Sequence, residues 1–247
     1  MKILSIGNSF SQDAQKWLHK ISAQNGLELE AVNLFIGGCS LEQHWNNVEE
    51  NKADYDLEYN GEGACQKISI GEALKMEKWD VITLQQASYH SGKPQAYIPY
   101  LQKLFEFVKA LQPNAKIYFH QTWAYEIDSD HGSFFEYNHN QQEMYRRIKD
   151  ASEMAARLIN IPLLKTGTVI QAMRENMPEF DYKNGGLSLC RDGFHLSLDY
   201  GRFAAGVVWF YTLTGEKPTV NAFEDFDAVL LNKVIDFAVS VLDNNEI

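Results

Sequence analysis

Residues 2–14 read K-I-L-S-I-G-N-S-F-S-Q-D-A, and the rest of the chain is expected to be built around this stretch. Residues 2–6 form a short apolar run, which is typical of a central strand of a parallel sheet that is buried on both faces. Gly7 and Asn8 tolerate a sharp turn, and residues 11–13 carry the capping chemistry that opens a helix. Ser9 therefore lies where open α/β sheets place their active sites. Its hydroxyl either takes part in chemistry, beside backbone N–H groups that can face a developing negative charge, or only caps the helix.

The rest of the chain has the length and composition of one α/β domain. Its 247 residues are 45% apolar, which is enough to bury a substantial core. The 22 basic and 33 acidic residues give a net charge of −11, which disfavours a nucleic acid or an anionic membrane surface as partner and suits a small neutral substrate. The three cysteines are widely spaced, so we expect buried free thiols at Cys39, Cys65 and Cys190.

The sequence contains no segment suited to a membrane or to a leader. No stretch approaches 18 apolar residues, and the first predicted strand begins at residue 2, which leaves no room for a signal peptide. We therefore expect a soluble protein, cytoplasmic as the sequence stands, and periplasmic or secreted if a leader was removed.

Apolar runs that alternate with helical periodicity predict five parallel strands separated by helices. The strands are expected at residues 2–6, 29–36, 79–84, 115–120 and 161–164. The helices are expected at about residues 12–24, from 40 onward, 70–76, 94–112, 138–159, 167–173, 199–212 and 225–242. Residues 51–67 are polar and contain glycine, so we expect a surface insertion there, with a hairpin as one form of it. Residues 1–247 are thus predicted to form a single domain.

The second predicted strand also ends in a turn, whose two glycines have no side chain to cover the backbone. Gly37 and Gly38 follow it directly and serve either as a tight turn or as backbone donors. Ser40 then caps the next helix. His44 lies one turn into that helix, where it is a candidate to line a substrate pocket, although a lone histidine more often has a structural role.

The third and fourth predicted strands deliver polar and aromatic residues to the same edge of the sheet. Gln85 and Gln86 end the third strand, where they either hydrogen bond within a site or belong to a solvated loop. Trp123 follows the fourth strand and is a second candidate pocket residue. The loop at residues 128–131 reads D-S-D-H, a pattern that can ligate a metal, but no partner motif accompanies it and no metal is expected.

Residues 190–197, near the other terminus, read C-R-D-G-F-H-L-S. Asp192 and His195 are three apart, a spacing at which the carboxylate can contact one imidazole nitrogen while the other faces outward. Together with Ser9 they supply a nucleophile, an orienting carboxylate and a general base in the order Ser, Asp, His. His195 would take the hydroxyl proton as Ser9 attacks a carbonyl, Asp192 would fix the tautomer, and backbone N–H groups would hold the oxyanion.

These motifs resemble those of the SGNH (GDSL-type) hydrolases, and within them a poorly characterised bacterial branch. The G-N-S-F-S of residues 7–11 resembles the G-D-S-x-[ST] nucleophile block with Asn for Asp, and the D-G-F-H-L-S of residues 192–197 resembles the D-x-x-H-L block. Gly38 falls where the family has its oxyanion glycine. After strand three the family usually has G-x-N-D, whereas residues 85–88 here read Q-Q-A-S.

The resemblance implies a flavodoxin-like, three-layer α/β/α sandwich with a five-stranded parallel sheet of order 2-1-3-4-5. It also implies ester hydrolysis through Ser9, Asp192 and His195 without a metal or an organic cofactor. Many relatives remove acetyl groups from carbohydrates, so we expect a short acyl ester as the substrate, with esters of carbohydrates as one candidate. The alternative is a catalytically weak or inactive protein of the same fold that binds a carbohydrate or another small ligand.

The oxyanion hole is where the sequence departs from its relatives. The backbone N–H groups of Ser9 and Gly38 are expected to supply two donors. A glutamine amide is expected to replace the family asparagine. Neighbouring residues of a strand face opposite sides, so only one amide can point inward, and we expect Gln85, with Gln86 as the alternative.

Overall fold

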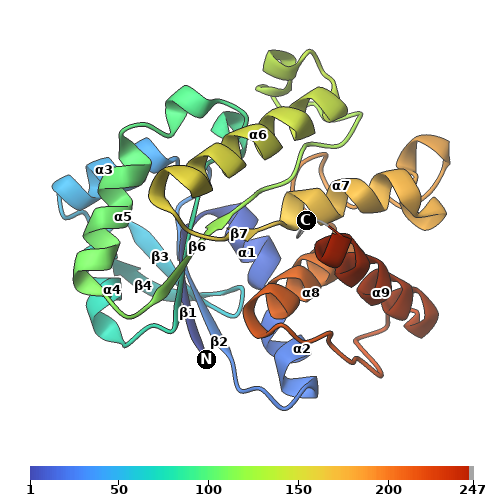
Figure 1. Cartoon of the computed structure of the whole chain (residues 1–247), viewed down its shortest axis with the longest axis horizontal. Helices are drawn as coiled ribbons and strands as arrows, with labels where there is room; N and C mark the ends of the chain where they lie inside the picture. The colour runs from blue at the N-terminus through green and yellow to red at the C-terminus, as the bar shows by residue number, and fades with distance from the viewer. Residues whose placement is uncertain (245–247) are drawn as a thin grey trace.

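The computed structural model of the protein describes residues 1–244, and of Ala64 and Cys65 it describes only the backbone. A seven-stranded sheet with the order β4-β3-β2-β1-β5-β6-β7 runs through its centre (Figure 1). Five of these strands are parallel: β1 (Lys2–Gly7), β2 (Glu30–Phe35), β5 (Val81–Gln85), β6 (Lys116–His120) and β7 (Leu163–Leu164). Their order, β2-β1-β5-β6-β7, is the predicted 2-1-3-4-5 order of a flavodoxin-like sheet, which is confirmed.

Helices cover both faces of the sheet, as the predicted three-layer sandwich requires (Figure 1). One face carries α3 (Leu41–Glu49), α4 (Ile70–Met76) and α5 (Tyr100–Leu111). The other carries α1 (Ser9–Gln15), α2 (Leu18–Gln24), α8 (Tyr200–Thr214) and α9 (Ala228–Asn244). Two further helices, α6 (Gln141–Ile159) and α7 (Thr166–Asn176), follow β6 and β7. Short 3₁₀ turns complete the chain: η1 (Ser88–His90), η2 (Pro94–Ala96), η3 (Phe134–Tyr137), η4 (Pro178–Phe180) and η5 (Tyr182–Asn184).

The first strand is the central element of the core. Its side chains alternate between the two apolar clusters, because successive residues of a strand point to opposite faces. Ile3 lies in the cluster under α1, α2, α8 and α9, whereas Leu4 and Ile6 lie in the cluster under α3, α4 and α5. All three side chains are fully buried, as the unbroken apolar run predicted.

The predicted insertion at residues 51–67 contains a hairpin, one of the forms expected of it, and this hairpin extends the sheet while residues 51–54 and 66–67 are exposed. It contains β3 (Tyr55–Tyr59) and β4 (Glu62–Ile68), and β3 pairs antiparallel with β2. Asn60 and Gly61 both have positive φ, at 53° and 73°, as an Asn-Gly hairpin turn requires. The edge of β2 offers unpaired backbone groups, so the hairpin extends the sheet and buries Tyr55 in the core.

Two predicted helices differ in their boundaries. The predicted helix 12–24 is divided into α1 and α2 by a break at Lys16 and Trp17. The Trp17 indole donates to the carbonyl oxygen of Leu198, 3.0 Å away, so tertiary contact decides the position of the break. The predicted helix 94–112 becomes η2 followed by α5, because Pro99 lacks an N–H and the residue before a proline avoids helical backbone angles.

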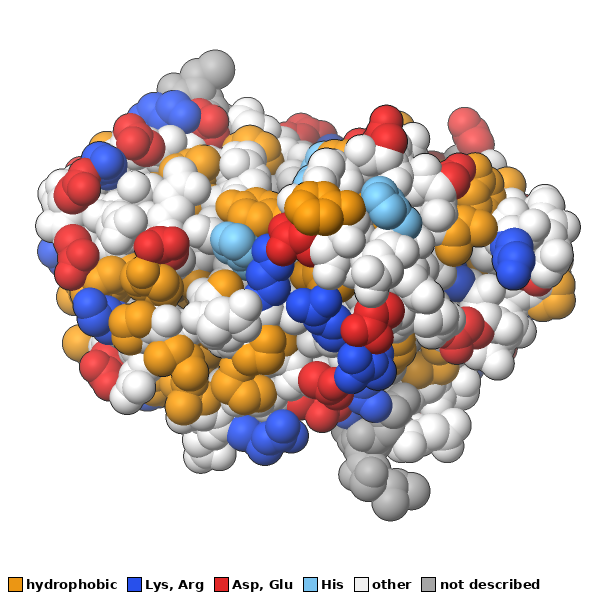
Figure 2. All heavy atoms as spheres, turned by 90° about the horizontal axis from the view of Figure 1, so that it is seen from above, with side chains coloured by type: hydrophobic (Ala, Val, Ile, Leu, Met, Phe, Trp, Pro, Cys, Tyr) orange, Lys and Arg blue, Asp and Glu red, His pale blue; other side chains and the backbone are white. Residues whose placement is uncertain are grey.

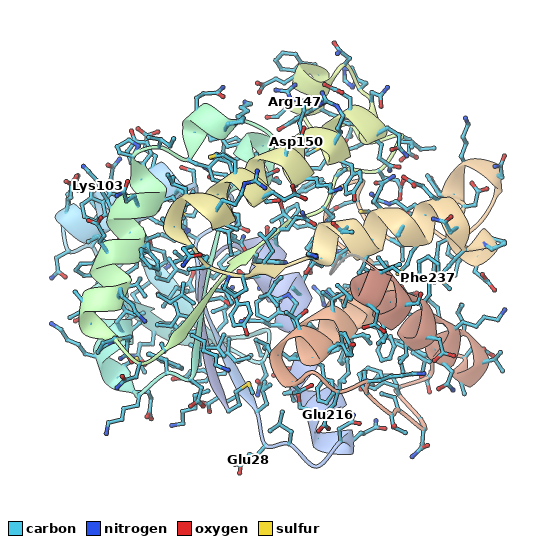
Figure 3. The ribbon with its side chains drawn as sticks, viewed as in Figure 1. Glu28, Lys103, Arg147, Asp150, Glu216 and Phe237 are labelled. Carbon is cyan, nitrogen blue, oxygen red and sulfur yellow. The ribbon has the colours of Figure 1, made fainter. Side chains whose placement is uncertain are left out.

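The surface of the described residues is mixed in character. None of the helices in residues 1–244 combines the length and the apolar character that crossing a bilayer demands. Acidic and basic side chains are interspersed on the face shown in Figure 2. In Figure 3 the labelled Glu28, Lys103 and Glu216 lie at the periphery, away from the sheet. Cys39 and Cys190 are free and buried, as predicted, whereas the side chain of Cys65 lies outside the described part of the chain.

Candidate active site

The turn between β1 and α1 holds Ser9 at the first position of the helix. Asn8 is the N-cap: its Oδ1 accepts from the backbone N–H of Phe10 at 2.9 Å, and its own N–H donates to Ser11 Oγ at 3.0 Å. A Cβ on Gly7 would lie 2.0 Å from Ser11 Oγ, so only glycine fits there. Because Asn8 and Ser11 cap the helix, the hydroxyl of Ser9 is left available for another role.

Ser9 lies in line with His195 and Asp192, the two residues with which the sequence analysis grouped it. His195 Nε2 lies 2.8 Å from Ser9 Oγ, and His195 Nδ1 lies 2.7 Å from Asp192 Oδ2. Asp192 Oδ1 also accepts from the backbone N–H groups of Phe194 and His195. Partial burial raises the pKa of Asp192, but the hydrogen bonds from His195 and the backbone outweigh it, so the net pKa is lowered. An ionised carboxylate only accepts, so Nδ1 carries the proton and Nε2 can accept the proton of Ser9.

A buried aspartate that the sequence analysis did not single out anchors this arrangement. Asp13 lies one turn after Ser9 on α1 and is fully buried. It accepts from the backbone N–H of Leu196 at 2.9 Å and from Arg191 Nη1 at 3.0 Å. It also accepts from Arg202 Nε on α8, at 2.8 Å. One carboxylate thus ties the helix that begins at Ser9 to the segment that carries His195, and its only sequence signal was a charge four residues after the serine.

The Ser9 hydroxyl faces a cavity of about 330 Å³, which we call the Ser9 pocket. Its lining includes Ser9, Gly38, Ser88, His131, Phe194 and His195. Gly38 has a φ of +64°, which favours glycine, and its carbonyl oxygen accepts from Tyr89 Oη at 3.1 Å. Within residues 1–244 no hydrogen bond uses the backbone N–H of Ser9 or Gly38, so both groups are free to serve as the donors expected of them.

Gln85 lies beneath the turn of Ser9 and not in the Ser9 pocket, in contrast to the expectation that its amide faces the oxyanion. Its Nε2 donates to Asn8 Oδ1 at 2.6 Å, and its Oε1 accepts from His120 Nδ1 at 3.0 Å. His120 is fully buried, which lowers its pKa to about 3, so it is neutral with one ring proton. His120 Nε2 therefore accepts from Thr166 Oγ1 at 3.0 Å. Gln85 is the middle of a buried chain of hydrogen bonds that braces Asn8 from below.

Gln86, the alternative donor, is also committed elsewhere. Its Oε1 accepts from the backbone N–H of Leu41 at 3.1 Å, and its Nε2 donates to the carbonyl oxygen of Ala96 at 2.9 Å. Both glutamines are 1% exposed and neither lines the pocket. The sequence left open whether these amides hydrogen bond within a site or belong to a solvated loop. The structure shows both buried and hydrogen bonded, where they join elements of the fold because buried polar groups need partners.

The two candidate pocket residues, His44 and Trp123, are both fully buried, which corrects their assignment. His44 Nδ1 lies 2.9 Å from Tyr55 Oη in the hairpin, and burial lowers the pKa of His44 to about 3. Trp123 stacks on Phe10 with ring centroids 4.3 Å apart and donates its indole N–H to the carbonyl oxygen of Phe194. Trp123 therefore supports the wall of the Ser9 pocket from behind without reaching its surface.

Ser88 and His131 are among the pocket residues that were not assigned to the site from the sequence. Ser88 belongs to the Q-Q-A-S stretch, where attention went to the glutamines. His131 belongs to the D-S-D-H loop that was weighed as a metal site, yet its ring lines the Ser9 pocket beside Phe194. Among the described residues no group of three His, Cys, Asp or Glu side chains is arranged to hold a metal ion.

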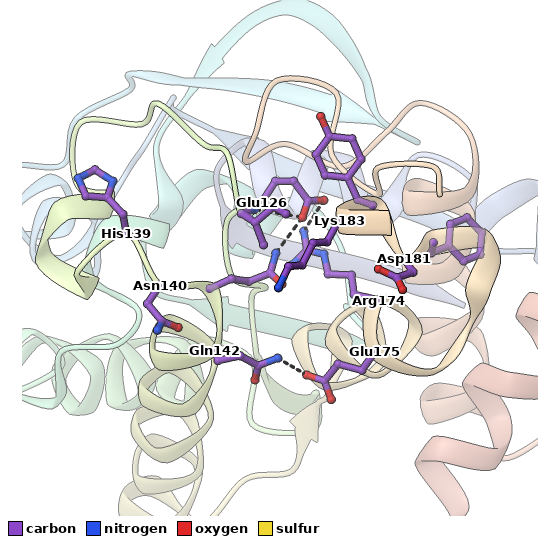
Figure 4. Close-up of a pocket in the computed structure, with 12 residues that line it drawn as sticks. Glu126, His139, Asn140, Gln142, Arg174, Glu175, Asp181 and Lys183 are labelled. Atoms are coloured by element: carbon purple, nitrogen blue, oxygen red, sulfur yellow. Dashed lines mark hydrogen bonds and ion pairs between the residues drawn. The ribbon is translucent and has the colours of Figure 1, made fainter. Parts of the chain in front are cut away.

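A second cavity, of about 350 Å³, lies apart from the Ser9 pocket (Figure 4). Glu126, at its centre, accepts from Ser188 Oγ at 2.8 Å and lies 3.5 Å from Arg174 Nη2. At its rim Gln142 donates to Glu175 at 2.7 Å. None of the triad residues lines it, and these polar groups bond to one another, so it offers no group poised for ester chemistry.

Comparison with known proteins places the chain among proteins of this architecture. The model of the family described as "Domain of unknown function (DUF4886)" matches residues 2–233. A crystal structure of a DUF4886 family protein from Bacteroides uniformis matches with a TM-score of 0.90 and 36% sequence identity, over 98% of this chain and 94% of that chain. No curated protein matches the sequence.

Two other solved structures share the fold at lower identity. One is a protein from Slackia heliotrinireducens proposed to be an SGNH hydrolase, with a TM-score of 0.59 and 22% identity over 86% of this chain and 98% of that chain. The other is the lipase/acylhydrolase from Enterococcus faecalis, with a TM-score of 0.55 and 11% identity over 90% of this chain and 99% of that chain. At these identities the likeness shows the SGNH-like fold alone.

Proposed function

The chain belongs to the DUF4886 family, and we propose that it is a serine ester hydrolase of the SGNH type. The observation that carries this proposal is the line of three side chains at the pocket. Ser9 Oγ lies 2.8 Å from His195 Nε2, and His195 Nδ1 lies 2.7 Å from Asp192 Oδ2. A serine needed only to cap a helix would have no use for an imidazole oriented by a carboxylate, and Asn8 already performs that capping role.

The reaction follows from this geometry. His195 Nε2 takes the proton of Ser9 as Oγ attacks the ester carbonyl carbon, and Asp192 stabilises the imidazolium that forms. The carbonyl oxygen becomes an oxyanion next to the backbone N–H groups of Ser9 and Gly38. His195 then returns the proton to the leaving alkoxide oxygen, which releases the alcohol and leaves an acyl group on Ser9. Water, deprotonated by His195, cleaves that acyl ester and restores the serine.

The Ser9 pocket suits a short acyl group. A cavity of about 330 Å³ shared with the alcohol part of an ester holds an acetyl group more easily than a long chain. The rings of Phe35, Tyr89 and Phe194 in its lining offer flat apolar faces of the kind that sugar rings contact. We therefore retain an acetyl ester of a carbohydrate as the proposed substrate class.

The second candidate function is a protein of this fold that binds a small ligand and hydrolyses esters weakly or not at all. The observation that favours it is the position of Gln85 and Gln86, since neither amide lines the pocket to replace the asparagine of the family. The two candidates differ in whether Ser9 forms a covalent bond.

Labelling with a fluorophosphonate probe tests the choice. The wild-type protein should gain the mass of the probe less HF, because Ser9 Oγ displaces fluoride from phosphorus, and Ser9→Ala should not. Ser240→Ala, which alters an exposed serine of α9, should label like wild type. Wild type should hydrolyse p-nitrophenyl acetate with a higher kcat/KM than p-nitrophenyl octanoate. Equal labelling of wild type and Ser9→Ala would refute the hydrolase, and an unlabelled, inactive wild type would favour the binding protein.

A further inference from the structure

We propose that the hydroxyl of Ser88 is the third donor of the oxyanion hole, in the place where relatives use a side-chain amide, and that Tyr125 and His131 orient it. This inference rests on the proposed ester hydrolysis. It concerns the last residue of the Q-Q-A-S stretch, which stands where the family has G-x-N-D and to which the resemblance gives no role.

Ser88 is placed for this role by the fold. It is the first residue of η1, three positions after the end of β5 at Gln85, and β5 pairs with β1, which ends at Gly7 two positions before Ser9. Ser88 is 7% exposed and lines the Ser9 pocket together with Ser9 and Gly38, which provide the two backbone donors. Its carbonyl oxygen accepts from Ser91 Oγ at 2.7 Å, which fixes the turn.

A chain of hydrogen bonds leads to Ser88, and its direction is set by its first group, the backbone N–H of Ser133, which can only donate. The backbone N–H of Ser133 donates to His131 Nδ1 at 3.1 Å, so that nitrogen carries no proton. Partial burial lowers the pKa of His131, which keeps the ring neutral. A neutral imidazole has one ring proton, and here it must be on Nε2.

The next two hydrogen bonds lead from His131 through Tyr125 to Ser88 in the pocket. His131 Nε2 lies 3.4 Å from Tyr125 Oη and, carrying the proton, donates to it. Tyr125 is fully buried, and its own hydrogen goes to Ser88 Oγ, 2.9 Å away. Within residues 1–244 the Ser88 hydroxyl has Tyr125 as its only hydrogen-bond partner. Ser88 therefore accepts from Tyr125, and its own hydrogen is left to point into the Ser9 pocket.

This chain of hydrogen bonds can stabilise an anion in the Ser9 pocket, but it cannot act as a base there. Each donor polarises the next, so the last O–H becomes a stronger donor than an isolated hydroxyl. None of its members acts as a base toward Ser9 in this arrangement, because the lone pair of His131 Nδ1 is occupied by the N–H of Ser133 and the hydroxyls of Tyr125 and Ser88 are weak bases. The chain thus complements a negative charge that develops in the pocket, which is the requirement of an oxyanion hole.

The experiment compares kcat and KM for p-nitrophenyl acetate among the wild type and three variants. Loss of one oxyanion donor typically lowers kcat by about 10²–10³-fold. Ser88→Ala should show that loss with KM changed by less than about threefold, because the donor acts on the transition state. Ser88→Thr keeps the hydroxyl and should retain kcat to within about tenfold of wild type. Tyr125→Phe keeps Ser88 but removes the group that orients it, so kcat should fall by about 3–30-fold without a change in KM.

The outcomes separate this inference from the function on which it rests. If Ser9→Ala abolishes hydrolysis and Ser88→Ala retains kcat within about threefold of wild type, the Ser88 assignment is overturned and the hydrolase stands. Equal losses in Ser88→Thr and Ser88→Ala would also overturn it, because the hydroxyl would then not be the feature that matters. Hydrolysis that persists in Ser9→Ala, or an inactive wild type, would overturn both. Thermal unfolding of each variant checks that the fold is kept, and Tyr125→Phe tests the inference with Ser88 intact.

Discussion

Two chains of hydrogen bonds end at the Ser9 pocket, and they run in opposite directions. On one side Ser9 donates to His195, and His195 donates to Asp192, a carboxylate that can only accept. On the other side the direction assigned above starts at Ser133, a backbone N–H that can only donate, and ends at the Ser88 hydroxyl. The group at the end of each chain away from the pocket therefore determines the role of the hydroxyl in the pocket. Ser9 gives its proton toward Asp192, whereas Ser88 donates its hydrogen into the pocket.

The two chains also differ in how they are held. The carboxyl group of Asp192 is 41% exposed, whereas Tyr125 is fully buried between its partners. The exposed chain needs an anchor from outside, and Asp13 supplies it by accepting from Leu196 and Arg191. The buried chain is kept in place by the packing around it. Substitutions along the Ser9–His195–Asp192 chain should therefore change a charge or the position of a side chain. Substitutions along the chain from Ser133 to Ser88 should change only the direction in which the hydroxyl groups donate their hydrogen bonds.

The largest expected effect comes from replacing Asp192, the carboxylate that ends the Ser9–His195–Asp192 chain of hydrogen bonds. Asp192→Asn replaces an acceptor by an amide that can also donate, so His195 loses both its tautomer and its countercharge. We expect kcat for p-nitrophenyl acetate to fall by about 10²–10⁴-fold with the fold intact. Asp130→Asn, on an exposed residue of a nearby loop, is the matched control and should act like wild type. A loss of less than about threefold in Asp192→Asn would contradict the triad.

The next effect comes from removing the anchor. Asp13→Asn leaves Arg191 and Arg202 facing a neutral group inside the protein, and breaking a buried ion pair in this way costs about 3 kcal/mol of the free energy of unfolding. Urea denaturation measures the loss. Asp150→Asn is the control, because its ion pair with Arg146 is exposed and should contribute less than about 1 kcal/mol. Equal stability of the two variants would show that the anchor is not needed.

The smallest effect concerns the third chain, which runs beneath Asn8 through Gln85 to His120. Burial lowers the pKa of His120 to about 3 from 6.5, so the unfolded chain binds a proton between these values and the folded chain does not. The free energy of unfolding should therefore fall as the pH drops below about 6.5, by roughly 2 kcal/mol between pH 7 and pH 5 from this residue. Above pH 7 the contribution is constant. Urea titrations at both pH values should show a smaller pH dependence for His120→Gln, and an unchanged one would contradict the assignment.

Much of the fold was predictable, because its signals are local. The apolar run of β1, the turn at residues 7–9 and the helical periodicity each depend on residues a few positions apart. The Asp192 and His195 pair is local as well, since a turn of three residues is enough to bring the two side chains together. Even the hairpin carried a local signal in Asn60 and Gly61, but nothing local stated that it would join the sheet.

Most of the errors concern residues whose partners are distant in the sequence. Gln85 was expected in the oxyanion hole, but it bonds to Asn8 and His120, which are 77 and 35 positions away. His44 and Trp123 were expected at the pocket surface, yet both are buried: Trp123 bonds to Phe194, 71 positions away, whereas His44 bonds to Tyr55 of the hairpin, only 11 positions away. A polar or aromatic residue at a strand end has several physical uses, and only its neighbours in space select one.

From the sequence alone came the alternation of strands and helices, the turn at Ser9 and the Asp-x-x-His pair, because backbone preference and hydrophobic periodicity act over a few residues. The order of the strands was expected only from the resemblance to the SGNH hydrolases. Only the tertiary structure decided which polar groups line the pocket and which are buried beneath it. It brought Ser88 to Tyr125, 37 positions away, and Asp13 to Leu196, 183 positions away. The physical reason is that a buried polar group must find a partner, and the identity of that partner depends on how all the layers pack together.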